Sequence, residues 1–182
     1  MVGAGGFGRV VHEHISLKYN CAFIDDGIKI GTIIDGVEVI GTTHDLKKLR
    51  ENYDNLLVTI GNNTVRESIY NNSSKWGYFF PNLVHKSAFI SKHAKIGHGC
   101  IVLNNAVIQS GASIGNGVII SPGVEIHHDS SIGDNALIYT NTVVRSLARV
   151  GKRAHIGSTL TISNEVIIPD DGVIIDGQTV LK

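Results

Sequence analysis

One periodic pattern constrains the fold of this chain more than any other feature of its sequence. From Val84 to Val180, every sixth residue is Val or Ile, without exception. An α-helix repeats its apolar residues about every 3.6 positions and a half-buried strand repeats them every second position, so neither explains this period. The pattern predicts a β-solenoid, in which each six-residue segment forms one short strand and one turn and places its β-branched residue inside.

A second inward series and a longer period refine this prediction. Small residues such as Ala106, Ala112 and Ala136 recur four positions after the Val or Ile residues, which suits a narrow interior. Glycines recur every eighteen residues from Gly97 to Gly151, and eighteen residues make three segments. We therefore expect a coil with three faces and with glycine at one corner, where the backbone needs a positive φ or a close approach to its neighbour.

The first 81 residues follow a different pattern. Strand-like apolar segments lie near residues 21–24, 36–41 and 56–61. They alternate with three helix-like segments, of which the first follows the N-terminal glycines and ends at about Lys18 and the others cover residues 45–52 and 64–71. This alternation predicts a small Rossmann-like α/β domain with a parallel sheet over residues 1–81. The solenoid is expected to occupy residues 82–182.

A glycine-rich motif, G-x-G-x-x-G, spans Gly3 to Gly8. Its backbone N–H groups and the following helix N-terminus can hold phosphate, and Asp25 or Asp26 can accept hydrogen bonds from a sugar or base. Two alternatives stay open, a nicotinamide-binding domain and a glycine turn that only packs a strand on a helix. Only Met1 and Val2 precede the motif, so either the protein begins upstream or the first strand is short.

The composition excludes several classes of partner. Lys and Arg together number 16, as do Asp and Glu, so no net field favours nucleic acid or a membrane surface. No apolar run reaches transmembrane length, so we expect no membrane insertion. The cysteines, Cys21 and Cys100, do not suggest a disulfide framework, which makes a cytoplasmic setting the default expectation. The histidines lack the Cys or carboxylate spacing typical of zinc, so no metal is expected.

The chain resembles the hexapeptide-repeat sugar acetyltransferases of the bacillosamine and sialic-acid type (PglD/NeuD-like family). The resemblance covers nearly the whole chain and rests on the solenoid together with the segments 3–6, 23–26, 39–41 and 60–63 and Arg66. It implies a left-handed parallel β-helix that binds acetyl-CoA and an α/β domain that binds the nucleotide of a nucleotide-linked amino sugar. The residues it assigns to that substrate are Gly3, Gly5, Gly6, Phe7, Asp25, Asp26 and Asn62.

The candidate catalytic residues are His128 and Asp129. The inward positions Ile126 and Ile132 place both residues at a corner of the coil, from which a base can reach a ligand. By resemblance, neutral His128 takes a proton from the attacking sugar amine and Asp129 fixes the histidine tautomer. The preceding residue, His127, is interpreted as an orienting or surface residue.

The resemblance also assigns residues to acetyl-CoA, namely Leu137, Ser146 and His155. Leu137 occupies a position where the family often has a second histidine near the acetyl group, and His155 lies one coil further in the same column. The family forms homotrimers with the active site between adjacent solenoids, so we expect a homotrimer here.

The expected function is that of an acetyl-CoA-dependent acetyltransferase. Its expected substrate is a nucleotide-linked 4-amino-4,6-dideoxy sugar for surface glycan biosynthesis, N-acetylated by direct transfer. O-acetylation of sialic acid stays open because a hydroxyl and an amine need the same base. A non-catalytic solenoid that binds a nucleotide sugar is the alternative of another class.

Overall fold

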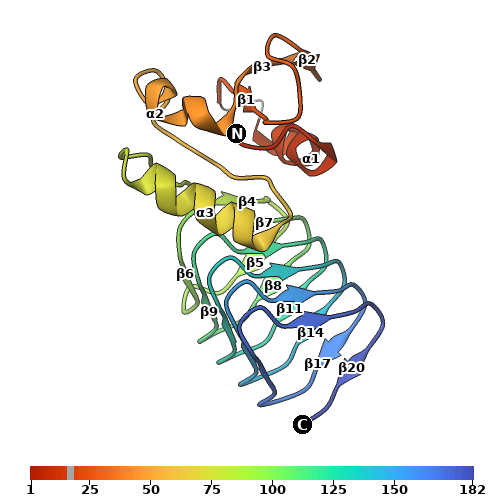
Figure 1. Ribbon diagram of the computed structural model, residues 1–182. Coiled ribbons are helices and arrows are strands. Elements are labelled where there is room, and N and C mark those ends of the chain that lie inside the picture. The colour runs from red at the N-terminus through yellow and green to blue at the C-terminus, as the bar shows by residue number, and fades with distance from the viewer. Residues whose placement is uncertain (16–18) are drawn as a thin grey trace. The chain divides into compact units, whose positions relative to one another are not determined.

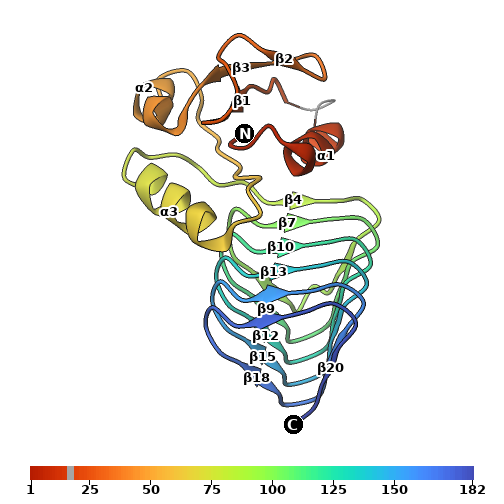
Figure 2. The same ribbon diagram turned by 45° about the vertical axis from the view of Figure 1, so that its right-hand side comes forward.

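The protein consists of two compact units, Met1–Pro81 and Asn82–Lys182, in a computed structural model that describes residues 1–15 and 19–182. Figures 1 and 2 show the first unit from red to yellow, with helices and a small sheet. The second unit runs from green to blue and consists of stacked coils of short strands.

The sheet of the first unit is short and mostly parallel. β1 (Phe23–Ile24) pairs in parallel with β3 (Val37–Gly41), which pairs in the antiparallel sense with the edge strand β2 (Ile33–Ile34). Val2 extends this arrangement, because it makes parallel bridges to β1 and to Val58. The expected parallel sheet is therefore present, with one antiparallel edge strand.

The segment expected to form a strand near residues 56–61 is extended and buried, but only isolated bridges hold it. Val58 bridges to Val2, and Asn55 bridges to Phe79. Leu56, Leu57 and Val58 are all buried. The apolar run therefore places this segment in the core of the unit, while its pairing is too short to count as a regular strand.

The helices of the first unit are α1 (Gly6–Ile15), α2 (Leu46–Leu49) and α3 (Asn63–Ser74), and a 3-10 turn, η1 (Thr43–Asp45), precedes α2. The helix expected to reach about Lys18 is described only to Ile15, since residues 16–18 lie outside the described part of the chain. The helix expected over residues 45–52 is reduced to the 3-10 turn and one α-helical turn.

The second unit is a left-handed parallel β-helix with three faces. Its two-residue strands form parallel sheets of 6, 6 and 5 strands, and each strand pairs with the strand three positions further along the chain. The strands are β4 (Leu83–Val84), β5 (Phe89–Ile90), β6 (Lys95–Ile96), β7 (Ile101–Val102), β8 (Val107–Ile108), β9 (Ser113–Ile114), β10 (Ile119–Ile120), β11 (Glu125–Ile126), β12 (Ser131–Ile132), β13 (Leu137–Ile138), β14 (Val143–Val144), β15 (Arg149–Val150), β16 (His155–Ile156), β17 (Thr161–Ile162), β18 (Ile167–Ile168), β19 (Val173–Ile174) and β20 (Thr179–Val180).

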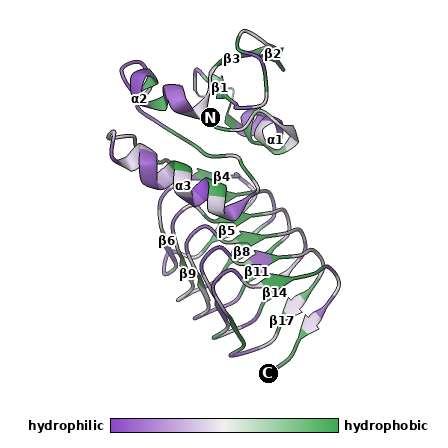
Figure 3. Ribbon diagram, viewed as in Figure 1, coloured by the Kyte–Doolittle hydropathy of each residue, from purple (hydrophilic) through white to green (hydrophobic). Residues whose placement is uncertain are grey.

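From Val102 to Ile168 the six-residue series lines the interior of this β-helix, as predicted, whereas Val84 at its start is exposed. Ile108, Ile126 and Val144 are fully buried, and the small residues Ala106 and Ala136 join them in one continuous core. Figure 3 shows apolar residues recurring on most of the labelled strands of successive coils. Burial of apolar area along the axis stabilises the stack by a free energy of roughly 25 cal/mol per Å². A single coil cannot bury its apolar residues alone, so stability comes from stacking.

Glycine has two different uses at the corners. At Gly133 and Gly151 a Cβ atom would lie 2.5 Å and 2.4 Å from backbone nitrogens of the next coil, so these residues allow close approach. Positive φ is required elsewhere, at every sixth residue from Gly99 to Gly177. Of the two reasons expected for the glycines spaced by eighteen, close approach is the one that applies.

Candidate active site

One corner of the solenoid presents two histidines side by side. It lies between β11, which ends at Ile126, and β12, which begins at Ser131. Between the inward residues Ile126 and Ile132, His128 and Asp129 are exposed, whereas Ser130 is buried. Asp129 has a φ of 60°, in the left-handed region, where Gly, Asn and Asp are the residues best tolerated.

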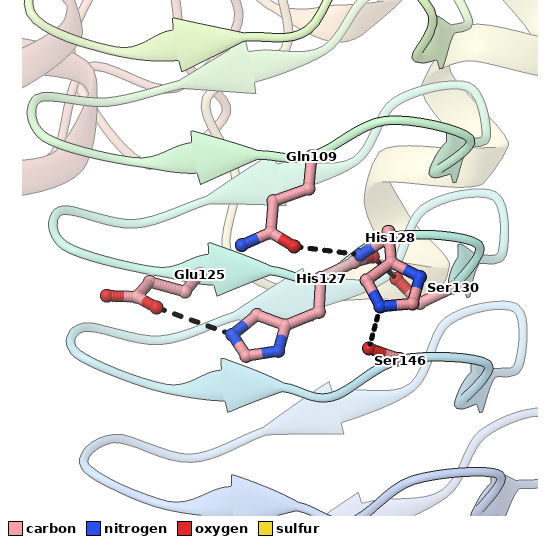
Figure 4. A network of polar contacts seen from close by, with 6 residues as sticks. All are labelled: Gln109, Glu125, His127, His128, Ser130 and Ser146. Carbon is pink, nitrogen blue, oxygen red and sulfur yellow. Dashed lines mark hydrogen bonds and ion pairs between the residues drawn. The ribbon is translucent and has the colours of Figure 1, made fainter.

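His128 makes side-chain contacts through both of its ring nitrogens. Nδ1 lies 2.9 Å from Oδ2 of Asp129, and Nε2 lies 2.9 Å from Oγ of Ser146. Its backbone N–H donates to Oε1 of Gln109 at 3.1 Å (Figure 4). A carboxylate only accepts hydrogen bonds, so the Nδ1 hydrogen belongs to the Asp129 contact and Nε2 is left as the acceptor for the Ser146 hydroxyl.

The contact between His128 and Ser146 follows from the architecture. The two residues are 18 positions apart, so they occupy the same corner of consecutive coils. The His128 side chain is 56% exposed, whereas Ser146 is only 8% exposed. A solvent-facing imidazole is thus fixed from both sides, by a carboxylate on its own coil and by a nearly buried hydroxyl on the next.

His127 belongs to a second and weaker pair. Its Nε2 lies 3.4 Å from Oε2 of Glu125, and its side chain is 26% exposed, less than half the value for His128 (Figure 4). Its carbonyl oxygen accepts a hydrogen bond from Oγ of Ser130 at 2.5 Å, which ties the turn together. Of the two histidines, His128 has the shorter carboxylate contact and the more accessible ring.

The residues assigned to acetyl-CoA divide into two groups. Ser146 contacts His128 through its hydroxyl. Leu137 and His155 are register partners in β13 and β16, which lie in a different sheet from β11 and β14. Leu137 is only 3% exposed, and the ring of His155 lies 5.1 Å from that of Tyr139. A separation of nine residues is half a coil, so a single chain does not bring Leu137 to His128.

The glycine motif of the first unit contains both constrained and unconstrained positions. Gly3 has a φ of +101°, and a Cβ atom there would lie 3.0 Å from the carbonyl oxygen of Thr59. A Cβ atom on Gly8 would lie 2.0 Å from the carbonyl oxygen of Gly3, so Gly8 serves the packing of α1. At Gly5 and Gly6 a Cβ atom would meet nothing within 4 Å in the described chain. Packing therefore explains Gly3 and Gly8 and leaves Gly5 and Gly6 open to a ligand.

The acidic pair after β1 holds this part of the fold together. Oδ2 of Asp25 accepts from the backbone N–H of Ala4 at 2.8 Å, and its Oδ1 accepts from Gly27 at 2.9 Å. Asp26 accepts from the backbone N–H and the hydroxyl of Thr43, at 2.6 and 2.8 Å. Both carboxylates thus have structural partners that the spacing of the sequence did not reveal.

Two other residues assigned to the substrate lie beside helix ends. Asn62 caps α3, since its Oδ1 accepts from the backbone N–H of Val65 at 3.0 Å. Phe7 lies in the first turn of α1 and is half-buried. Sequence reasoning did not use the helix-capping pattern of Asn62, although an Asn directly before a helix is its ordinary signal.

No cluster of three or more potential metal ligands occurs in the described residues. None of the helices in that same part of the chain has the length and apolarity needed to cross a membrane.

Comparison with known proteins accounts for both units. Residues 1–73 match the PglD N-terminal domain, and residues 93–128 and 111–146 match the bacterial transferase hexapeptide repeats. A curated relative, UDP-N-acetylbacillosamine N-acetyltransferase from Bacillus subtilis (strain 168), is 32% identical over 109 residues, which cover 57% of this chain and 50% of that protein. The chain thus spans about half the length of the curated relative it matches.

Solved structures share the fold over almost the whole chain. The acetyltransferase domain of PglB from Neisseria gonorrhoeae FA1090 matches 99% of this chain and 89% of its own, with a TM-score of 0.91 and 27% identity. The same domain in complex with acetyl coenzyme A matches 98% of this chain and 92% of its own, with a TM-score of 0.83 and 28% identity. A mutant of perosamine N-acetyltransferase from Caulobacter crescentus, in complex with CoA and GDP-perosamine, has a TM-score of 0.78 at 23% identity, with coverage of 96% and 91%. The chain therefore combines a region that matches the PglD N-terminal domain with a region that matches bacterial transferase hexapeptide repeats, and it shares the fold of the PglB acetyltransferase domain.

Proposed function

We propose that this protein transfers an acetyl group from acetyl-CoA to the amine of a nucleotide-linked 4-amino-4,6-dideoxy sugar, with His128 as the general base. The observation that carries the proposal is the exposed imidazole of His128, whose Nδ1 lies 2.9 Å from Oδ2 of Asp129. That contact leaves Nε2 as the proton acceptor. The similarity to an N-acetyltransferase of a UDP-linked sugar supports the choice of acceptor.

The proposed reaction is a direct transfer. The amine nitrogen of the sugar attacks the thioester carbonyl carbon while Nε2 of His128 removes a proton from that nitrogen. The C–S bond then breaks, the CoA thiolate leaves, and the imidazolium returns the proton to it. Asp129 stabilises the transient imidazolium and prevents the ring from turning. The Ser146 hydroxyl must leave Nε2 before the amine can approach it.

The N-terminal domain is proposed to hold the nucleotide of the acceptor. Gly5 and Gly6 leave space beside the start of α1, where backbone N–H groups and the helix dipole favour a phosphate. Asp25 has one hydrogen bond from the protein on each carboxylate oxygen, so each oxygen retains a lone pair for a ribose or base.

The acceptor can be tested with a panel of sugars. Purified protein is incubated with acetyl-CoA and with UDP-linked 4-amino sugars, GDP-linked 4-amino sugars or free sialic acid, and CoA release and acetylated product are measured. We expect a UDP-linked amino sugar to react fastest. Fastest reaction with sialic acid would instead identify an O-acetyltransferase, and binding of the sugars without any transfer would identify a non-catalytic solenoid.

We further propose a homotrimer, in which a neighbouring solenoid completes the acetyl-CoA site. The support within this chain is the placement of Leu137 and His155 in the sheet that contains β13 and β16. His128 lies at the corner between β11 and β12, which belong to the other two sheets, so one chain does not gather the assigned residues. Light scattering at micromolar concentration should give three times the mass of the chain. A monomer that still transfers acetyl groups would contradict this assembly.

A further inference from the structure

Asp129, His128 and Ser146 form a row of carboxylate, imidazole and hydroxyl, which is the set of groups used in nucleophilic catalysis by serine. Oδ2 of Asp129 lies 2.9 Å from Nδ1, and Oγ of Ser146 lies 2.9 Å from Nε2. A hydroxyl within hydrogen-bond reach of a base that a carboxylate orients is the arrangement of an activated serine nucleophile. The direct-transfer mechanism gives the Ser146 hydroxyl no chemical role.

The surroundings of Ser146 favour a reactive role over a structural one. Its hydroxyl makes a single hydrogen bond in the described chain, the one to His128 (Figure 4). Its backbone N–H has no acceptor among the described residues. This N–H can therefore donate to the oxyanion that forms when the hydroxyl attacks a carbonyl carbon. The residue is 8% exposed, and its hydroxyl is therefore held against the imidazole and largely shielded from water.

We propose that Ser146 accepts the acetyl group itself when no sugar occupies the site, so that the protein hydrolyses acetyl-CoA slowly through an acetyl-serine. The inference rests on the proposed function only in taking acetyl-CoA as the bound acyl donor. The sugar amine and the Ser146 hydroxyl compete for the same nitrogen, Nε2 of His128. A bound acceptor displaces the hydroxyl and suppresses the hydrolysis.

The chemistry needs no reactant other than acetyl-CoA and water. Oγ of Ser146 attacks the thioester carbonyl carbon as Nε2 takes the hydroxyl proton. The C–S bond breaks, and the thiolate receives that proton and leaves as CoA. A water molecule then attacks the ester carbonyl and gives a proton to Nε2, the bond between Oγ and the acetyl carbon breaks, and Oγ takes the proton back. The products are acetate and free Ser146.

A matched control lies one coil earlier in the same column. Ser110 is 18 residues before His128, as Ser146 is 18 residues after it. Ser110 is exposed, and its hydroxyl makes no hydrogen bond within the described residues. Substitution of Ser110 by alanine removes the same atom from the same kind of corner without touching the imidazole.

The experiment compares CoA release without acceptor and acetyl transfer to the best sugar acceptor in wild type, Ser146→Ala, Ser110→Ala and His128→Ala. Ser146→Ala should lower acceptor-free release by roughly a hundredfold or more. Transfer to the sugar should fall by about tenfold at most, because the ring loses one orienting hydrogen bond. Ser110→Ala should match wild type in both assays, and His128→Ala should lose both. Acid-quenched wild-type protein should yield a peptide containing Ser146 that carries one extra acetyl group.

The outcomes separate this inference from the proposed function. If Ser146→Ala releases CoA as fast as wild type without acceptor, or loses both activities to the same extent, the nucleophile is not Ser146 even where sugar transfer is normal. If Ser146 becomes acetylated while no sugar is acetylated, the inference stands and the proposed function fails. A merely structural role for the hydroxyl predicts equal losses in the two assays, which is the result that overturns the proposal.

Discussion

At the scale of single residues, Asp129 serves two purposes that can be separated by mutation. Its backbone has a φ of 60°, and its carboxylate contacts Nδ1 of His128. Asparagine tolerates the left-handed conformation and can still accept a hydrogen bond, but it lacks the charge that stabilises an imidazolium. Alanine has no side-chain acceptor, and the left-handed conformation costs it roughly 1–2 kcal/mol.

We therefore expect Asp129→Asn to leave the free energy of unfolding unchanged and to lower kcat to a value between those of wild type and His128→Ala. Asp129→Gly should also keep stability, whereas Asp129→Ala should lose roughly 1–2 kcal/mol. Denaturant unfolding and steady-state kinetics measure the two effects independently. A wild-type kcat in Asp129→Asn would show that the charge has no part in catalysis.

The corner position of His128 was predictable because the phase of the six-residue repeat fixes which residues turn outward. Its contact with Ser146 also follows from the spacing, since residues 18 apart occupy the same corner. The roles of Asp25 and Asp26 were not predictable from spacing, because they depend on the direction of N–H groups in loops and turns. Such directions are set by backbone angles that residue types constrain only weakly.

At the scale of the six-residue element, every segment from Gly99 to Gly177 has one residue with positive φ. Up to Asn141 this position holds only Gly, Asn or Asp, the residues that adopt the left-handed conformation most easily. Later segments place Leu147, Arg153 and Thr159 there, with φ values of 64°, 54° and 55°. Those segments adopt the left-handed conformation although their residue types disfavour it, because the flanking strands and the buried core fix the backbone conformation of the turn.

Thr159 is the most strained of these positions, since a β-branched residue is an outlier at positive φ. Its side chain is exposed and makes no hydrogen bond in the described chain. Thr159→Asn should therefore raise the free energy of unfolding by about 1 kcal/mol. The matched control, Thr161→Asn, lies in β17, where a β-branched residue is favoured, and should give no gain. Equal effects of the two changes on the melting temperature would contradict this account of the turn.

At the scale of the whole molecule, the two units differed in how much of them could be predicted. The solenoid was predictable almost to the residue, because one rule repeats along the unit and the Val or Ile residues from Val102 to Ile168 are all buried in its interior. The α/β unit was predictable in class but not in its elements. Its central parallel pairing rests on single bridges at Val2 and Val58, and so short a segment has no periodicity of its own.

The central claim for the whole molecule is that this solenoid catalyses acetyl transfer with His128 as the base. Its most direct test is kcat for acetyl transfer to the best acceptor in wild type, His128→Ala and His127→Ala, with circular dichroism to verify folding. Because the His128 side chain is mostly exposed, His128→Ala should stay folded, and kcat should fall by roughly 10² to 10⁴. His127→Ala should lose far less. Near-normal turnover in a folded His128→Ala protein, or loss of transfer only in His127→Ala, would contradict the account.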